Sequence, residues 1–271
     1  MGTLIKKLFI VFIVLIIINV GFIWYGQANF KATMKSLGKA FVESNATSTV
    51  AQKPPTLIEQ YIKNSNLSQK SYKALALQFD GEYSPKPSKS MNMHTLALLR
   101  PAPNMLLGTR LDSNLVVTFN AIETYYDGNA NMQMLLFGII PTGEFNDEKF
   151  ARSELARLLA YSVFNPALLK YKNIKYETVD KTHIKATITD GKIDASVIFI
   201  SDKNGKIIEV QSSDRLRPVK KRLQKTAWKM RILSYDKFDG LNLPKDVEEL
   251  WVEDGKDMVY SRYSLTSAKQ L

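Results

Sequence analysis

With 271 residues, 45% of them hydrophobic and including three Trp, 12 Tyr and 13 Phe, the chain can hold one large domain or two small ones and is not disordered throughout. It contains no cysteine, which excludes disulfides, cysteine-based zinc sites and a catalytic thiol. The 37 basic and 26 acidic residues give a formal net charge of +11, which favours contact with anionic surfaces such as lipid headgroups, nucleic acid or acidic glycans.

The N-terminal segment predicts a membrane anchor. No charged residue occurs from Leu8 to Phe30, and LFIVFIVLIIINVGFIW (8–24) is almost continuously apolar. As a helix this stretch spans roughly 26 Å, close to the hydrocarbon thickness of a bilayer. A cleaved signal peptide is the alternative, but its apolar region is usually shorter, and WYGQANF offers no A-x-A cleavage site. We therefore expect residues 1–30 to form a short stub and an uncleaved, single-pass transmembrane anchor.

A second helical pattern follows the anchor directly. Phe30, Met34, Leu37 and Phe41 recur at spacings of four, three and four, so residues 31–53 are expected to form a juxtamembrane amphipathic helix and a tether. The apolar side of this helix can lie on headgroups, pair with a partner helix, or simply extend the anchor. The polar stretch ESNATSTVAQKPP reads as the tether, and the globular domain is expected to occupy residues 54–271.

Most of this domain predicts β-strands. PPTLIEQYIKNS favours a short opening helix, because its prolines suit a first turn and its apolar residues share one face. From Tyr72 onward apolar residues alternate at a spacing of two, which is typical of half-buried strands. About ten such segments follow, separated by Pro, Gly, Asn and Asp, and Asn204-Gly205 predicts a two-residue hairpin turn.

One strong helix interrupts the strands. Asn146 is the expected N-cap, Leu155, Leu158 and Leu159 form an apolar stripe, and Pro166 prevents simple continuation. A large antiparallel sheet that curves without closing exposes an apolar concave face, which such a helix can cover. The expected fold is therefore mainly β (α+β): a curved antiparallel sheet, or half-barrel, covered by the central helix at 147–163, with the N-terminal transmembrane helix outside it.

The residue patterns do not predict an enzyme. His94 and His183 are the only histidines and have no metal-ligand spacing around them, and no G-x-S-x-G, P-loop or strand-linked G-x-G-x-x-G occurs. The acidic pairs Glu123 with Asp127 and Asp190 with Asp194 have the pattern of strand-edge and turn residues. We accordingly expect no cofactor and no metal.

Two other stretches bear on binding. ETYYDGN (123–129) has the pattern of strand aromatic residues leading into a hairpin. SSDRLRPVKKRLQKTAWKMR contains eight basic residues against one acid, which indicates a solvated face or a surface that docks on anionic headgroups. Nucleic acid is not expected as a partner, because the chain shows no recognition motif and its anchor removes it from the usual compartments.

The order of motifs over about residues 54–254 resembles an uncharacterised family of bacterial membrane-anchored proteins, a domain of unknown function. The resemblance rests on the segments PPTLIEQYI, IETYYDGNA and RLLAYSVFNPALL, and on the motif of Asp214, Arg215 and Arg217, followed by Trp228, Tyr235, Gly240, Pro244 and Trp251. Two departures are Tyr161, where the family usually has Glu, and the missing Trp before Asn165-Pro166. If that Glu is catalytic in the family, this chain has lost the reaction, which favours a binding or structural role.

The family is similar in architecture to periplasmic lipoprotein carriers, in which a curved sheet encloses an apolar cavity under helical lids. The resemblance implies that the anchor sits in the bacterial inner membrane, with its N-terminal stub in the cytoplasm and the C-terminal domain in the periplasm.

The leading hypothesis is a membrane-anchored domain that binds a lipid or another apolar ligand in a half-barrel cavity. The alternatives are a structural or scaffolding subunit of a cell-envelope complex, with an envelope protein as partner, and an envelope hydrolase, for which the sequence shows no clustered ionisable groups. The expected ligand-binding residues are Tyr126, Leu155, Arg157, Leu158, Leu159, Arg215, Arg217 and Trp228.

Overall fold

The structure is a computed structural model that describes residues 2–44, 52–67, 72–86, 89–113, 117–219 and 222–271, leaving out the side chains at 2–4, 11–12 and 15–19. The helices are α1 (Gly2–Glu43), α2 (Thr56–Asn64) and α3 (Glu148–Ala160), followed by the 3-10 turns η1 (Tyr161–Val163) and η2 (Pro166–Lys170). The strands are β1 (Leu75–Lys86), β2 (Lys89–Leu99), β3 (Met105–Asp112), β4 (Thr118–Tyr126), β5 (Asn129–Leu136), β6 (Ile140–Phe145), β7 (Ile174–Thr178), β8 (His183–Asp190), β9 (Ile193–Ser201), β10 (Ile207–Ser212), β11 (Leu216–Val219), β12 (Arg222–Lys225), β13 (Ala227–Ile232), β14 (Tyr235–Phe238), β15 (Leu241–Pro244), β16 (Asp246–Glu253) and β17 (Lys256–Gln270).

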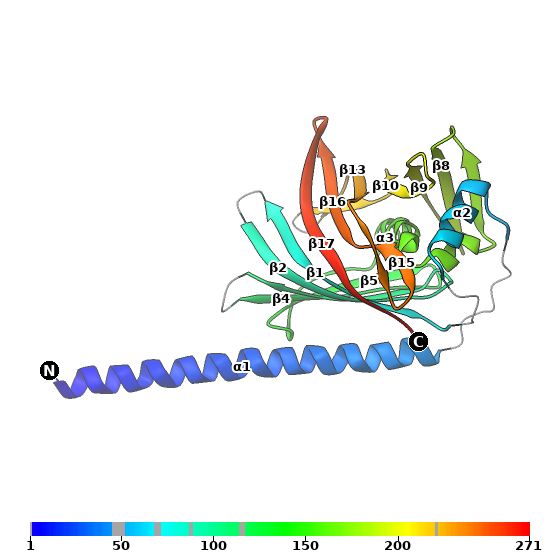
Figure 1. Cartoon of the computed structure of the whole chain (residues 1–271). Helices are drawn as coiled ribbons and strands as arrows, with labels where there is room; N and C mark the ends of the chain where they lie inside the picture. The colour runs from blue at the N-terminus through cyan, green and yellow to red at the C-terminus, as the bar shows by residue number, and fades with distance from the viewer. Residues whose placement is uncertain (1, 45–51, 68–71, 87–88, 114–116, 220–221) are drawn as a thin grey trace.

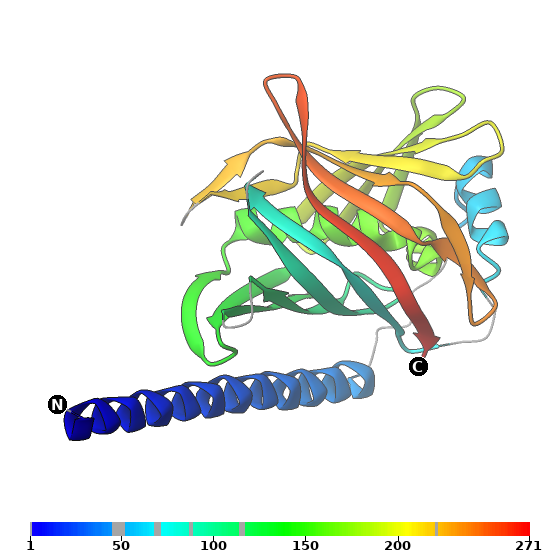
Figure 2. The same ribbon diagram turned by 60° about the vertical axis from the view of Figure 1, so that its left-hand side comes forward.

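Thirteen of these strands form one antiparallel sheet in the order β6-β5-β4-β3-β2-β1-β17-β16-β13-β10-β9-β8-β7. The sheet bends strongly, so that its two arms face each other across α3 (Figures 1 and 2). The arms come together where the backbone N–H of Gly128 in the β4–β5 turn donates to Asp190 at the end of β8 (2.9 Å). The edge strands β6 and β7 do not pair within the described residues, so the sheet is not closed. The expected curved antiparallel sheet with a central helix is confirmed.

Helix α3 lies inside the curve rather than over an opening. It contacts β5 and β4 of one arm and β9, β10 and β8 of the other. Leu155, Leu158 and Leu159 are fully buried, as expected for the apolar stripe, but Ser153 and Glu154 on another side of the helix are buried as well. Because both arms enclose it, α3 is a core element of the half-barrel.

Two local predictions were wrong. The N-cap of α3 is Asp147, whose carboxylate accepts the N–H of Phe150 (2.7 Å), and not Asn146. The β9–β10 connection is a five-residue loop and not a two-residue turn, because Asp202 accepts the backbone N–H groups of Asn204 (2.8 Å) and Lys206 (2.9 Å). In both places a nearby aspartate, one residue after Asn146 in the first case and two residues before Asn204 in the second, satisfies the exposed backbone donors.

Helix α1 is a single continuous helix whose C-terminal part packs on the convex face of the sheet. Met34 and Phe41 are buried there against apolar residues of β2 to β5. The buried guanidinium of Arg100 donates to the carbonyls of Phe41 and Ser44 and so satisfies the carbonyls at the end of α1. Of the apolar stripe expected at 30–41, Phe30, Met34 and Phe41 therefore face the chain's own sheet, whereas Leu37 is 36% exposed. The tether expected after the stripe lies mostly at 45–51, outside the described residues.

The N-terminal half of α1 projects beyond the body of the protein (Figure 1). Within the described residues, no helix is both long and apolar enough to cross a membrane, so the structure does not support the spanning helix expected at 8–30.

Candidate functional site

The concave face of strands β1 to β5 becomes less buried with distance from the middle of the sheet. Cross-strand partners form three successive rows on this face. The first row is Leu77, Ala97, Leu107, Glu123 and Met132; the second is Phe79, Thr95, Thr109, Ala121 and Met134; the third is Gly81, Met93, Leu111, Phe119 and Leu136.

The first row is completely buried, whereas Phe79 and Met93 alone are buried in the second and third rows. Phe119 in the third row is 37% exposed. We call the second and third rows together the open end of the half-barrel. This open end is mostly apolar, and its concave surface is only partly covered.

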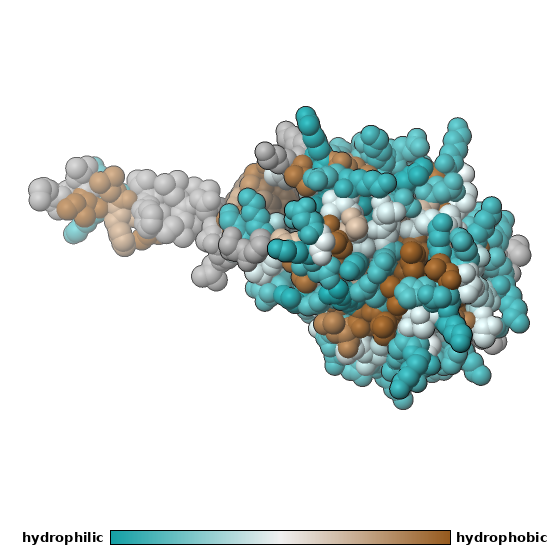
Figure 3. Space-filling view, turned by 90° about the horizontal axis from the view of Figure 1, so that it is seen from above, coloured by the Kyte–Doolittle hydropathy of each residue, from teal (hydrophilic) through white to brown (hydrophobic). Residues whose placement is uncertain are grey.

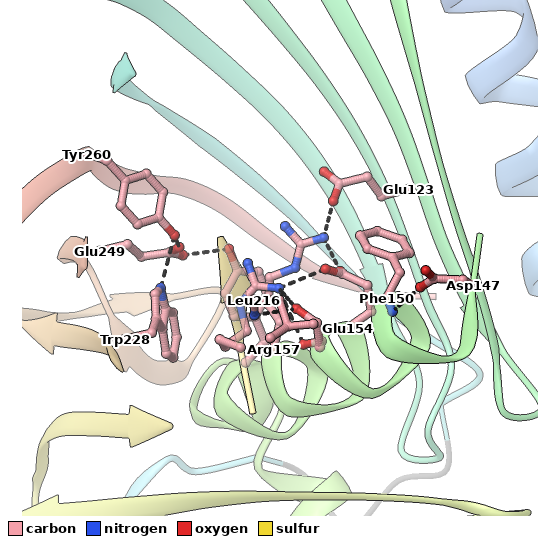
Figure 4. A network of polar contacts seen from close by, with 12 residues as sticks. Glu123, Asp147, Phe150, Glu154, Arg157, Leu216, Trp228, Glu249 and Tyr260 are labelled. Carbon is pink, nitrogen blue, oxygen red and sulfur yellow. Dashed lines mark hydrogen bonds and ion pairs between the residues drawn. The ribbon is translucent and has the colours of Figure 1, made fainter. Parts of the chain in front are cut away.

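Where the covered part of the half-barrel meets the open end, side chains from β4, α3 and the residue just before β11 form a buried chain of ion pairs (Figure 4). Arg157 on α3 contacts the carboxylates of both Glu123 and Glu154. Glu154 also pairs with Arg215 (2.7 Å), whose guanidinium lies 5.6 Å from the centre of the Trp228 ring. Two carboxylates and two guanidinium groups therefore neutralise one another inside the protein.

A second buried cluster surrounds Glu249 on β16. Its carboxylate accepts hydrogen bonds from the hydroxyls of Tyr161 (2.8 Å), Tyr263 (2.8 Å) and Tyr260. The indole N–H of Trp228 donates to the Tyr260 hydroxyl (3.0 Å), which joins this cluster to the ion pairs beside Arg215. Arg157 lies 6.0 Å from the centre of the Tyr161 ring and makes a second connection.

Burial controls the protonation of these groups. It raises the pKa of Glu123, and the charge of Glu154 raises it further, whereas Arg157 lowers it. Burial and then the charge of Glu249 raise the pKa of Tyr260 and Tyr263, so both phenols remain protonated and act as donors. With every acid ionised, the two clusters together contain three carboxylates and two guanidinium groups, which leaves the negative charge of Glu249 stabilised by hydroxyl donors alone.

Every carboxylate of the network has a partner, whereas two of its buried arginine nitrogens have none among the described residues. Each carboxylate is held by arginine or tyrosine, and both histidines lie elsewhere, His94 beside Asp80 (2.7 Å) and His183 beside Asp180 (2.9 Å). Within the described residues no three His, Asp or Glu side chains are grouped as metal ligands. The Nε atoms of Arg157 and Arg215 are buried and have no hydrogen-bond partner among the residues described.

The structure brings together three of the residues expected to bind a ligand, Arg157, Arg215 and Trp228, and separates the others. Arg217 forms an ion pair with Glu253 at the edge of the site. Tyr126 is 36% exposed beside the β4–β5 turn, apart from the network. The three leucines of α3 lie in the central core.

Sequence reasoning missed the acids and phenols of the network. Glu249 alternates with the buried Val247 and Trp251 on β16, and Glu123 occupies the same face of β4 as the buried Tyr125. In both cases the acid occupies a position of the strand alternation that is otherwise apolar and buried, and this pattern could have predicted a buried acid. Tyr161, at the position where the resembled family usually has Glu, is the α3-side donor to Glu249.

Comparison of the sequence with known families gives one match, in which the family of unknown function DUF6544 covers residues 44–263. Comparison with curated proteins gives no similar sequence.

Solved structures with a similar fold include a LolA superfamily protein from Nitrosomonas europaea, 10% identical, covering 79% of this chain and 93% of that one with a TM-score of 0.40. A putative outer membrane lipoprotein-sorting protein domain from Vibrio parahaemolyticus is 13% identical over 79% of this chain and 90% of its own, with a TM-score of 0.44. A DUF1329 family protein from Desulfovibrio piger is 12% identical over 81% and 94%, with a TM-score of 0.43. The expected resemblance, an uncharacterised family with neighbours of the lipoprotein-carrier kind, is confirmed, and at these TM-scores it supports no inference about function.

Proposed function

The chain belongs to the family of unknown function DUF6544, and from its geometry we propose that it binds a lipid or another apolar ligand at the open end of the half-barrel. The observation that carries this proposal is the incomplete burial of the second and third rows. Leu111, Phe119 and Met134 face the concave side, yet none of them is fully buried. Because these side chains are already mostly buried, covering the remainder with an apolar ligand contributes up to about 1 kcal/mol for each.

The buried network suggests the chemistry of the ligand's polar end. Because Glu123 and Glu154 neutralise Arg157 and Arg215, these arginines are not free to bind an anionic headgroup. An added anion would also meet the charge of Glu249. A neutral group with a hydrogen-bond acceptor, such as an ester or a hydroxyl, fits this environment better, and we expect it beside the partly exposed rings of Tyr83 and Tyr260.

The test is to purify the full chain in mild detergent and to measure bound lipid per protein by native mass spectrometry and lipid extraction. We expect reproducible adducts of lipid mass that are lost in the double variant Leu111→Ser and Phe119→Ser. The control is Val179→Ser with Ile208→Ser, which makes the same kind of change at two exposed apolar residues, 56% and 43%, outside the open end. Absence of adducts in the unmodified chain, or equal loss in both variants, would contradict the proposal.

We also propose that α1 attaches the domain to a membrane and that the domain lies in the bacterial periplasm. The support is the projecting half of α1, where Leu8 is 62%, Phe9 is 63% and Ile10 is 59% exposed. Figure 3 shows apolar side chains on this helix well away from the body of the domain. Such side chains are stabilised when lipid removes them from water.

The chain's lack of cysteine gives a direct test of location. An Asn204→Cys variant should be labelled in intact cells by a maleimide that crosses the outer membrane but not the inner one, and the protein should remain with membranes after carbonate washing. Labelling only after lysis would exclude the periplasm, and release by carbonate would exclude insertion of α1.

A scaffolding role is the second candidate, because an apolar groove of an envelope partner could cover the same side chains of α1. In that case a photo-crosslinker at position 9 should capture one protein reproducibly instead of lipid.

A further inference from the structure

The connections at one end of the half-barrel are basic. The β1–β2 hairpin ends with exposed Lys86 and Lys89, and the β11–β12 hairpin carries exposed Arg222 and Lys225 together with Val219, which is 37% exposed. We call these five residues the rim. Among the described residues, none of the four basic side chains makes an ion pair, so their charges remain available to a partner.

Charges nearby on the same end do not cancel those of the rim. Arg217 and Glu253 neutralise each other, and Asp257 forms ion pairs with Lys229 and Arg231. The β16–β17 turn adds Asp254 and Lys256, one charge of each sign, both exposed. The rim therefore keeps an excess of positive charge, with an exposed valine on one of its hairpins.

The orientation of α1 suggests what the rim meets. In Figures 1 and 2, the N-terminal half of α1 extends past the body on the same side to which the β1–β2 and β11–β12 hairpins point. A lipid surface that takes up the apolar half of α1 lies on this side. The docked C-terminal part of α1 fixes the direction, because Met34 and Phe41 are buried against the sheet.

We propose that the rim docks on an anionic lipid surface, so that the open end of the half-barrel faces the membrane. A negative membrane surface attracts Lys and Arg within a Debye length, about 10 Å at 0.1 M salt. Val219 then enters the headgroup layer between these charges. This inference rests on the proposed attachment through α1. In the orientation that rim docking gives the domain, an apolar ligand passes between the bilayer and the concave face without crossing bulk water.

The test uses the full chain in vesicles of phosphatidylcholine alone or mixed with phosphatidylglycerol. Because the chain has no cysteine, an environment-sensitive fluorophore can be placed at one introduced site, Val219→Cys on the rim or Asn204→Cys in the β9–β10 turn. Asn204 is a suitable reference because it is exposed and its turn lies beside α2 at the other end of the protein. Vesicle flotation reports attachment separately.

We expect a blue shift at position 219 in the anionic vesicles alone and none at position 204. The shift should be lost at high salt and in the variant K86E/K89E/R222E/K225E. It should remain in the control K172E/K175E/K181E/K192E, which makes the same change of charge on exposed lysines of the β7–β9 arm.

Three results would overturn the inference: no shift at 219 although the protein floats with anionic vesicles, equal shifts at both positions, or a shift that survives reversal of the rim charges. Lipid adducts measured on the same preparations keep the two proposals apart. A shift without adducts leaves rim docking standing and removes the ligand proposal, whereas adducts without a shift do the reverse.

Discussion

Replacing Arg157 by Met tests whether the buried ion network sets the stability of the half-barrel. The side chains of Arg157, Glu123 and Glu154 are only 11%, 9% and 2% exposed. Glu154 keeps Arg215 as a partner at 2.7 Å, so Glu123 is the carboxylate left without a cation. Breaking a buried pair in this way costs about 3–5 kcal/mol.

Protonation sets an upper limit on this cost. From the ordinary pKa of 4.5, neutralising a glutamate at pH 7 costs about 3.4 kcal/mol, since each pKa unit is worth about 1.36 kcal/mol. Glu123 in the variant will take up a proton once its charge costs more than this. We therefore expect a loss of about 3 kcal/mol at pH 7, equivalent to roughly 6–12 °C in Tm for a domain of this size.

The pH dependence follows from the same carboxyl. Burial raises the pKa of Glu123 in the folded protein above its value in the unfolded chain. Stability contributed by this group is therefore fully present below the ordinary pKa and is lost as the pH rises through the raised one. Removing Arg157, whose charge lowers that pKa, makes the loss steeper. Near pH 5 the deficit of the variant should shrink to less than about 1 kcal/mol.

The assay is urea unfolding followed by tryptophan fluorescence at the two pH values, in one detergent. Arg152→Met is the matched control, because Arg152 is exposed on the same helix, and its effect should stay within about 0.5 kcal/mol. The double variant Glu123→Gln with Arg157→Met should recover most of the loss. A deficit under about 1 kcal/mol at pH 7, or an equal deficit at both pH values, would refute the reasoning.

Three further outcomes are expected. Arg100→Gln should leave the last carbonyls of α1 unsatisfied and increase hydrogen exchange in residues 30–43, with little change in the strands. Gly26→Val should detach α1 from the sheet, because a Cβ at Gly26 would collide with the backbone carbonyl of Phe137, and limited proteolysis should then release the helix. Gly128→Val should destabilise the domain by about 1–3 kcal/mol in thermal unfolding, since Gly128 has φ +76°, whereas Asn129→Val beside it should have a much smaller effect.

Local patterns were sufficient for most elements. Alternation at a spacing of two predicted strands such as β4 and β8, and apolar spacing of three and four predicted α3, because these periods arise from backbone geometry within one element. Pro166 predicted a helix end near residue 163, whereas α3 ends at Ala160 and the 3-10 turn η1 occupies Tyr161–Val163. The errors fell at caps and turns, where an Asp at 147 or 202 competed with the expected Asn.

The candidate site could be predicted only in fragments. Arg157, Arg215 and Trp228 were singled out by motif and charge, but the acids of the network were not, because Glu123, Glu154 and Glu249 come from β4, α3 and β16. No sequence spacing reports that these elements converge. The curvature of the sheet and the register of its strands bring them together.

The sequence by itself determined that this is a β-rich domain with one interrupting helix and a long apolar N-terminal segment, since each property depends on neighbours along the chain. The tertiary structure decided that α3 is enclosed by both arms and that its Glu154 and Arg157 are buried with partners from distant strands. It also decided that Met34 and Phe41 of α1 pack on the chain's own sheet, where Gly26 allows the helix to approach Phe137 closely. These features arise from contacts between residues far apart in the chain, whose energy depends on how the whole sheet bends.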